Sequence, residues 1–579
     1  KIYHSSNSLL SLNCDIQILA AMDGGEANPV TVILNQVAIV LEVSDDFLMN
    51  GPCRILEKTN LMERQIKSLF LIFSFFFFSI TSAQFKVLSE SSTFDEPEDV
   101  VSRIIQMKNG NTFYVHLTQK EGIDFRIYDP SHRQTVVSSV TPSFGKLKTG
   151  SLQNAFEIAN SIAVFISEYQ NGTPVLYRLV FDGTTGKLLE DKMIATVKKY
   201  TGVGFVNRSL VDAFNVKKAI TGEAYAVEVY DVFEDNKDKR IEIILYDKEH
   251  KEKKRTFLAT NDNDDYKFFV YMNMIMLDEN RVDVILYNGK EKYFYYTKKG
   301  RMVVATVDSR ETSVKITPVD LPAKIKFASC IVQYLPKTKK LYLLIREMNE
   351  KDRGNYDNYL VRINTETNKM ETKLVIDSDE ALNKKYREKF SLRDDYVAMY
   401  RDFVVHEDET YSIIYEERYS VSSPATGFGI NKQGTVTFYS GKIMVMNYNN
   451  KDEVLSGYIV PKSYNEDTYS QYKSPLYIAR GNSRYMLIND TERNNDFKKD
   501  KLVTITGVSE CDAFMYNLSG DEIVPKRDYF FGPNTESGHN LGAFRTSSYN
   551  SSNGMLVTLK LNKKSPSNKA VSVIWMQVQ

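Results

Sequence analysis

The residues best suited to do chemistry in this 579-residue chain are the tyrosines and charged side chains between positions 461 and 496. Tyrosine offers a flat apolar ring with a polar hydroxyl, which suits recognition of a sugar or of another protein. We therefore expect Tyr464, Tyr469 and Tyr472 to act as binding platforms. Nearby charged side chains are expected to act as polar anchors: Arg480, Asp490 and Arg493. The alternative is a solvated connection in which the tyrosines pack on their neighbours.

Metal chemistry is weakly supported. The run Asn489–Asp496 could offer oxygens to Ca²⁺, but it lacks the order of an EF-hand loop and the glycine at its sharp turn, so a charged loop is the simpler interpretation. The histidines have no metal-ligand spacing, standing at 116, 132, 250, 406 and 539 after the first one. We expect no metal site and no cofactor, with calcium near Asn489–Asp496 as the alternative.

No motif identifies an enzyme. Two residues separate the glycines of Asp182–Lys187, where a phosphate loop has four, so this segment is predicted to be a hairpin turn. Gly507–Cys511 lacks the closing glycine of a nucleophile elbow. A polysaccharide hydrolase or lyase would need carboxyl groups that converge in space, and no acidic residue recurs at one place in successive units. Binding is therefore the preferred function, and such an enzyme is the alternative.

The charge balance narrows the choice of partners. Lysine plus arginine and aspartate plus glutamate both number 74, so no general field attracts nucleic acid or an anionic membrane. The expected partner is an envelope protein or a glycan.

The elements that must position these residues are β-strands. Apolar alternating runs joined by polar turns recur along the chain. Ile123–Tyr128 turns into Thr135–Val140, Tyr293–Thr297 into Met302–Val307, and Tyr359–Ile363 into Met370–Ile376. Their irregular spacing, roughly 45 to 85 residues, is typical of a degenerate array of four-stranded units. The run Ala381–Phe390 interrupts the pattern and predicts a short helix with Asp377 as its N-cap.

This organisation resembles a β-propeller that covers 84–579, with about seven four-stranded blades and a range of six to eight. Trp575 is the only tryptophan, so the signatures of the WD, kelch and Asp-box propellers are absent and no named family is matched. The resemblance implies that Val571–Val578 closes the ring by pairing near Phe85–Leu88. Tandem β-sandwiches are the alternative fold. The Gly-bearing loop Ser422–Asn431 is of a kind that carries function on a rigid scaffold.

The segment Met62–Ala83 resembles a secretory signal peptide. Arg64 and Lys67 precede the apolar run Leu69–Ile80, and small residues end at Ala83, after which we expect cleavage. Twelve residues reach only about 18 Å as a helix, against roughly 30 Å of hydrocarbon, so a membrane anchor is the weaker interpretation. We expect an exported protein, whether periplasmic, on the cell surface or secreted, with residues 1–61 an upstream extension foreign to the natural protein. A short ordered extension is the alternative.

Two cysteines follow the expected cleavage point, Cys330 and Cys511. Both lie in strand-like runs, where a buried free thiol is commoner than a disulfide.

Overall fold

The computed structural model describes residues 85–579 except 96–100, 119–121, 148–149, 200–212, 261–265, 291–299, 320, 322–327, 349–355, 377–378, 391, 393–397, 423–435, 466–470, 496–501, 508–510, 533–538 and 566–567. The expected signal peptide, Tyr469, the helix cap Asp377 and most of the loop Ser422–Asn431 lie outside these residues. The described part belongs to one compact unit, Gln84–Gln579.

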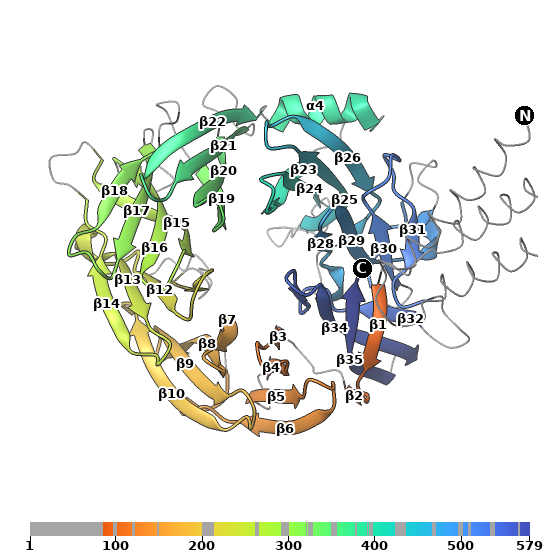
Figure 1. The fold of residues 1–579 in the computed structure, drawn as a ribbon, viewed down its shortest axis with the longest axis horizontal. Helices are drawn as coiled ribbons and strands as arrows, with labels where there is room; N and C mark the ends of the chain where they lie inside the picture. Colours follow the sequence, from red (N-terminus) through yellow and green to blue (C-terminus); the bar gives the residue numbers. More distant parts are fainter. Residues whose placement is uncertain are drawn as a thin grey trace, which may run out of the picture. The chain divides into compact units, whose positions relative to one another are not determined.

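The described residues form eight antiparallel sheets arranged in a ring, which is a β-propeller (Figure 1). Blade 1 contains β3 (Val101–Gln106), β4 (Thr112–Thr118), β5 (Gly122–Tyr128) and β6 (Gln134–Val140). Blade 2 contains β7 (Ser151–Ile158), β8 (Ser161–Gln170), β9 (Thr173–Asp182) and β10 (Leu188–Thr196). Blade 3 contains β11 (Phe214–Lys218), β12 (Tyr225–Tyr230), β13 (Ile241–Tyr246) and β14 (Glu252–Phe257). Blade 4 contains β15 (Phe268–Met276), β16 (Arg281–Gly289), β17 (Gly300–Asp308) and β18 (Lys315–Pro318).

The remaining blades carry small additions. Blade 5 contains β19 (Ala328–Leu335), β20 (Lys340–Met348), β21 (Tyr356–Asn364) and β22 (Lys369–Ile376). Blade 6 contains β23 (Ala398–Val405), β24 (Tyr411–Ser422), β25 (Val436–Tyr448) and β26 (Val454–Val460), with β27 (Tyr464–Asn465) paired to β25. Blade 7 contains β28 (Leu476–Arg480), β29 (Ser483–Asp490), β30 (Asp512–Asn517) and β31 (Arg527–Tyr529). Blade 8 contains β32 (His539–Gly542), β33 (Ser548–Asn550), β34 (Met555–Ser565), β35 (Asn568–Val578), β1 (Phe85–Glu90) and β2 (Phe94–Asp95).

Both ends of the described chain meet in blade 8. The outer strand β1 pairs antiparallel with β35, so that Phe85 lies opposite Val578 and Glu90 opposite Ile574. The predicted ring closure by Val571–Val578 is confirmed. The propeller is confirmed as well, and the tandem sandwiches are wrong. The eight blades lie within the predicted range of six to eight and are one more than the expected seven.

One expected hairpin is described only in part. Met302–Val307 lies in β17, which pairs with β16 at Arg281–Gly289 and with β18. The other half of the expected hairpin, Tyr293–Thr297, lies outside the described residues. The predicted helix is confirmed as α4 (Asp379–Phe390). Its Tyr386 is buried and meets the ring of Tyr415 edge-on at 5.6 Å, which fixes the helix on blade 6.

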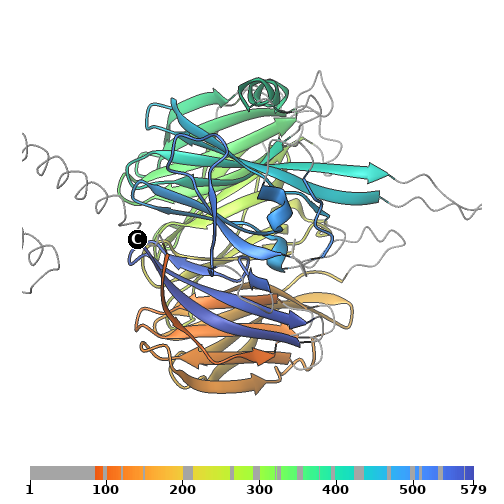
Figure 2. The same cartoon turned by 90° about the vertical axis from the view of Figure 1, so that its right-hand side faces the viewer.

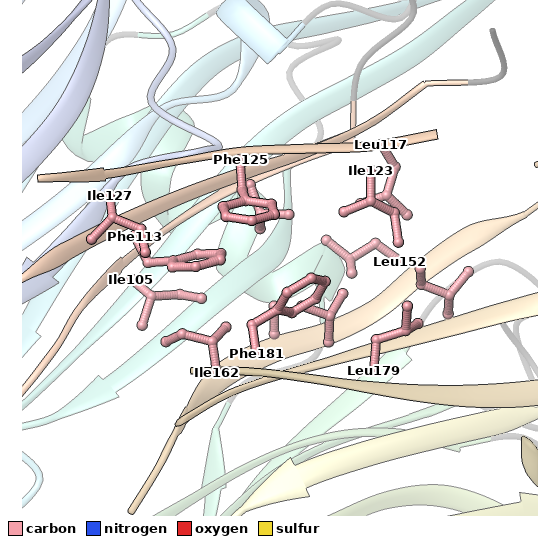
Figure 3. Close-up of a cluster of buried hydrophobic side chains, with 14 of the residues drawn as sticks. Ile105, Phe113, Leu117, Ile123, Phe125, Ile127, Leu152, Ile162, Leu179 and Phe181 are labelled. Atoms are coloured by element: carbon pink, nitrogen blue, oxygen red, sulfur yellow. The ribbon is translucent and has the colours of Figure 1, made fainter. Parts of the chain in front are cut away.

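The hydrophobic core lies between neighbouring blades. Figure 3 shows Phe113 and Phe125 of blade 1 facing Phe181 of blade 2. The rings of Phe113 and Phe125 stack at 5.2 Å, and Phe125 meets Phe181 at 5.2 Å. Strand β4 is buried on both faces, since each face packs on a different blade. Tyrosine and phenylalanine thus fill the packing roles that tryptophan has in other propellers.

The two faces of the ring differ in their connections. We call one side of the ring the turn face. On this side the first strand of each blade connects to the second strand, and the third connects to the fourth. The loop face is the opposite side, where the second strand runs into the third and the fourth runs into the next blade. Strands β24 and β25 are the longest of blade 6 and project beyond the other strands on the loop face (Figure 2).

Candidate functional site at blades 6 to 8

The structure places the predicted site residues in three different situations. Tyr464, Tyr472 and Asp490 come together at the loop-face end of blade 7, and all three side chains are buried. Arg493 is exposed at the same end, in the short helix η7 (Glu492–Asn495). Arg480 lies at the turn-face end of β28, next to the turn into β29. Seven residues of strand separate that turn from Asp490, a distance of about 23 Å, so Arg480 and Asp490 do not form one site.

The tyrosines are buried because β27 adds a fifth strand to blade 6. Tyr464 is only 2% exposed, and its hydroxyl donates a hydrogen bond to the Asn489 carbonyl. The side-chain amide of Asn489 donates to the carbonyls of Tyr472 and Gly542, both at 2.7 Å. The expectation of exposed platforms at Tyr464 and Tyr472 is therefore corrected: both side chains pack inside the protein, as the alternative interpretation held.

A charged network lies beside them and is centred on Glu416 of β24. The Glu416 carboxylate is fully buried and forms an ion pair with the equally buried Lys462. It also accepts hydrogen bonds from Arg401 of β23 at 2.6 Å and from Arg418 of β24 at 3.1 Å. Lys462 donates to Ser440 at 2.9 Å and lies 4.6 Å from the centre of the Tyr464 ring. Three cations thus surround one carboxylate.

The network sets the charge state of its members. Burial by itself would raise the pKa of Glu416, but the charges of Lys462 and Arg401 outweigh burial, so this pKa lies below its usual value. The neighbouring Asp402 is different, because burial raises its pKa and the charge of Arg401 only partly offsets that effect. The two arginine side chains remain partly exposed, 27% for Arg401 and 49% for Arg418.

Asp490 belongs to a second buried network. Its carboxylate accepts hydrogen bonds from the Thr491 amide at 2.8 Å, from Asn494 at 2.8 Å and from Arg527 at 3.1 Å. Burial nevertheless raises the pKa of Asp490 to about 6. The side-chain oxygens of Asn489 and Asp490 therefore already accept hydrogen bonds from protein donors, since Asn489 also accepts one from the Gly542 amide.

An Asp–His pair stands at the start of blade 8. His539 Nδ1 lies 2.9 Å from the Asp512 carboxylate, whose other oxygen accepts a hydrogen bond from the Asn540 amide at 2.9 Å. Asp512 is buried, whereas the His539 side chain is 34% exposed. Within the described residues His539 Nε2 has no hydrogen-bond partner. A carboxylate that orients an imidazole and leaves the second nitrogen open is an arrangement suited to general acid–base chemistry.

Sequence reasoning missed these two groups for different reasons. Glu416, Glu417 and Arg418 interrupt the apolar strand that starts at Tyr411, and such charges inside a predicted strand are a usable signal of a buried ion pair. Asp512 and His539 lie 27 residues apart and carry no common motif, so only the fold pairs them.

The prediction for the two cysteines is confirmed. Cys330 and Cys511 are buried free thiols, as predicted. In the described part of the chain no helix is long and apolar enough to cross a membrane. The same residues include no cluster of three or more His, Cys, Asp or Glu side chains placed to hold a metal ion.

Comparison with known proteins supplies structural neighbours only. No protein-family model matches the chain, and no curated protein matches it. A solved prolyl endopeptidase is similar at 12% identity and a TM-score of 0.36, over 84% of this chain and 55% of the other, so this chain spans about half its length. The polysaccharide lyase Uly1 is similar at 10% identity and a TM-score of 0.38, over 85% of this chain and 98% of the other. Drosophila Plexin A, solved in complex with Semaphorin 1b, is similar at 9% identity and a TM-score of 0.32, over 85% and 88%.

Proposed function

We propose that this protein is an exported binding module that recognises a glycan bearing carboxylate or sulfate groups on the loop face of blades 6 to 8. An acidic surface of an envelope protein is the other partner that the same chemistry would accept. Export rests on the sequence Met62–Ala83, and mass spectrometry of the secreted protein tests it, with Gln84 as the expected first residue.

The observation that carries the proposal is the excess of positive charge around Glu416. Asp402 and Asp490 also act on Arg401 and Lys462, and Arg527 pairs with Asp490. Four cations therefore face three carboxylates, so the partly exposed Arg401 and Arg418 keep a net attraction for anions. Because the Glu416 carboxylate holds both guanidinium groups in place, their exposed N–H groups are preorganised. The flat guanidinium fork matches the paired oxygens of a carboxylate or sulfate group.

Aromatic surface on the same hairpin favours a glycan. The rings of Tyr419 and Tyr439 stack at 5.0 Å with an angle of 9° between their planes, and 44% of Tyr419 is exposed. They lie one residue beyond Arg418, on the other side of the projecting hairpin. A polysaccharide that passes over the hairpin would meet the arginines on one side and the flat rings, which suit the apolar faces of sugars, on the other. Arg493, exposed at the loop face of blade 7, remains a proposed anchor of the same kind.

Binding to immobilised acidic glycans tests the proposal. We expect the wild-type protein to bind a sulfated or uronate-rich polymer and to be released by salt, because exposed charges are screened. Arg401→Gln with Arg418→Gln should weaken binding about tenfold or more. The matched control is Arg310→Gln, an exposed arginine whose Asp308 partner lies at the turn face of blade 4. Equal binding of the two variants, or equal binding to a neutral polymer, contradicts the proposal.

The pair Asp512–His539 favours a second candidate function, a lyase for uronate-containing polysaccharides. His539 Nε2 would accept the proton on the carbon next to the uronate carboxyl group. The electron pair of that C–H bond then forms a carbon–carbon double bond while the adjacent C–O bond breaks, and the departing sugar oxygen takes up a proton. Asp512 would hold the imidazole and stabilise its charged form.

Ultraviolet absorbance of the unsaturated product measures this activity. We expect activity on a uronate polymer, a loss of about a hundredfold or more in His539→Gln, and a smaller loss in Asp512→Asn. If acidic glycans bind but are never cleaved, the lyase function is contradicted and the binding function is still supported.

A further inference from the structure

A cavity of about 450 Å³ opens between blades 2 and 3 at the loop face. Blade 2 contributes Thr173 and the end of β10 with the residues after it, and blade 3 contributes the connection between β12 and β13. This place lies on the other side of the ring from blades 6 to 8 (Figure 1). Its volume falls in the range of small-molecule sites.

The carboxylates of this cavity are already engaged by protein groups. Asp231 accepts hydrogen bonds from the Lys198 amide at 2.9 Å and from the Phe233 amide at 3.1 Å. Glu234 forms an ion pair with the Lys198 ammonium at 2.9 Å. Glu242 pairs with Arg255 at 2.9 Å. Glu234 and Glu242 thus each have a cation partner, whereas Asp231 is held by backbone amides.

The remaining cations of the cavity form no ion pair in the described part of the chain, although the charge of Lys239, like that of Lys198, acts on Glu234. Within the described residues the side chains of Lys199 and Lys239 form no hydrogen bond and no ion pair, and both residues line the cavity. Arg240 is 95% buried, with 5% of its surface exposed. Its Nε donates to the Glu234 carbonyl at 2.9 Å, and its guanidinium lies 5.4 Å from the Phe268 ring centre. Arg240 Nη2 has no partner in the described part of the chain. Because this nitrogen has no acceptor, the positive charge of Arg240 is not fully compensated in the wall of the cavity, which favours an anion nearby.

The other wall of the cavity is apolar. Val197 and Val229 are buried there, and Phe257 presents 41% of its surface. The cavity is far larger than a single inorganic anion. It therefore has room for an organic group against the apolar wall while the charged end meets the two exposed lysines, Lys199 and Lys239.

We propose that this cavity binds a small organic molecule that carries a phosphate or sulfate ester. Lys199 and Lys239 approach the ester oxygens from the two sides of the cavity, and Arg240 holds positive charge in its wall. The organic body packs on Val229 and Phe257. This site shares no residue with the proposed glycan site, so an experiment that contradicts one proposal does not affect the other.

Isothermal titration with four probes tests the site: inorganic phosphate, inorganic sulfate, phenyl phosphate and phenyl sulfate. We expect saturable binding of at least one phenyl ester, tighter than that of its inorganic ion. The double variant Lys199→Gln with Lys239→Gln should weaken binding about tenfold or more. Both lysines are exposed, so this variant is expected to fold. The matched control Lys248→Gln changes an exposed lysine of blade 3 at the turn face and should bind as the wild type does.

The titration also separates the two esters. Tighter binding of phenyl phosphate or of phenyl sulfate identifies the natural group. The proposal is overturned if none of the four probes binds, if the double variant binds as tightly as the control, or if only the inorganic ions bind.

Discussion

Trp575 and His132 stack face to face across the junction of the last and first blades, with ring centres 4.5 Å apart and planes 8° apart. The Trp575 indole also donates a hydrogen bond to Thr112 at 2.9 Å, and Tyr128 meets it edge-on at 5.0 Å. A side chain from the third strand of blade 8 is thus inserted between the start of β4, the end of β5 and the turn that follows β5.

The same anchor recurs with arginine in place of tryptophan. Between blades 2 and 3 the buried Arg178 lies 5.1 Å from the ring of Tyr246, which stacks on Tyr225 at 5.0 Å. Between blades 5 and 6 Arg362 lies 5.8 Å from the ring of Tyr411. At each of these junctions a side chain from the third strand of one blade therefore packs against an aromatic ring of the next blade.

Loss of the indole hydrogen bond should be measurable on its own. Thr112→Val keeps the shape of the side chain and leaves the buried Trp575 N–H unpaired, so we expect a loss of about 1–3 kcal/mol in the free energy of unfolding. Urea unfolding followed by fluorescence measures it, since Trp575 is the only tryptophan. Thr312→Val, at an exposed position, is the control and should change stability little. Equal free energies of unfolding for Thr112→Val and Thr312→Val would contradict the claim that this hydrogen bond stabilises the junction.

Phe85 should be essential for closing the ring. Its buried ring meets Tyr485 at 5.0 Å and Phe530 at 5.1 Å, so it fastens the outer strand of blade 8 to blade 7. We expect Phe85→Ala to cost about 3–5 kcal/mol in urea unfolding. Val87→Ala in the same strand is the matched control, because Val87 is 49% exposed, and it should be nearly neutral. Similar effects of the two changes would show that β1 does not hold the ring closed.

Asp490 should make stability depend on pH in a defined direction. Its pKa of about 6 lies above the ordinary value of 3.8. The folded protein therefore binds this proton more tightly, so the contribution to stability is complete below pH 3.8 and is lost as the pH rises through about 6. Relative to Asp490→Asn, the wild type should lose about 3 kcal/mol between about pH 3 and about pH 7, at about 1.4 kcal/mol per pKa unit.

Urea unfolding at a series of pH values measures this difference. Asp528→Asn removes an exposed carboxyl group of the same blade and serves as the control. A difference between wild type and Asp490→Asn that stays constant with pH would rule out the titration of Asp490 in this window.

Removing the charge of Glu416 should leave the buried ammonium group of Lys462 without its carboxylate partner. We expect Glu416→Gln to cost about 3–5 kcal/mol, because Lys462 is fully buried beside it. Adding Lys462→Met should recover about 2 kcal/mol of that loss, since the unpaired charge is gone. Glu371→Gln is the control, an exposed carboxylate 3.9 Å from Lys340, and should cost less than about 0.5 kcal/mol. A double variant less stable than Glu416→Gln would contradict the pairing.

A repeated turn could have improved the sequence prediction. Asp129–Arg133, Asp247–Lys251 and Asn449–Glu453 each join the third strand of a blade to the fourth. In each the first residue donates its amide to the fifth residue's carbonyl at 2.9, 3.0 and 2.9 Å, and the fourth residue has a positive φ: His132, His250 and Asp452. An Asp or Asn followed five residues later by the start of the next strand therefore marks the outer hairpin of blades 1, 3 and 6.

The sequence by itself determined the strands, the helix and the closing pair. Ile123–Tyr128 alternates apolar and polar residues, and Val571–Val578 is a short, mostly apolar run rich in β-branched residues. Both patterns are local, so they can be recognised without knowing the partner strand. The helix at Ala381–Phe390 and the buried thiols at Cys330 and Cys511 follow from equally local signals.

Only the tertiary structure decided the number of blades and the content of the sites. Blade 8 joins Phe85–Glu90 to 539–578, Glu416 meets Lys462 from 46 residues away, and His539 meets Asp512 from 27. Tyr464 is buried because β27 pairs with β25, which composition cannot show. Alternation along a strand sets which side chains share a face, but pairing between distant strands sets what each face meets, and charge and burial follow from that second step.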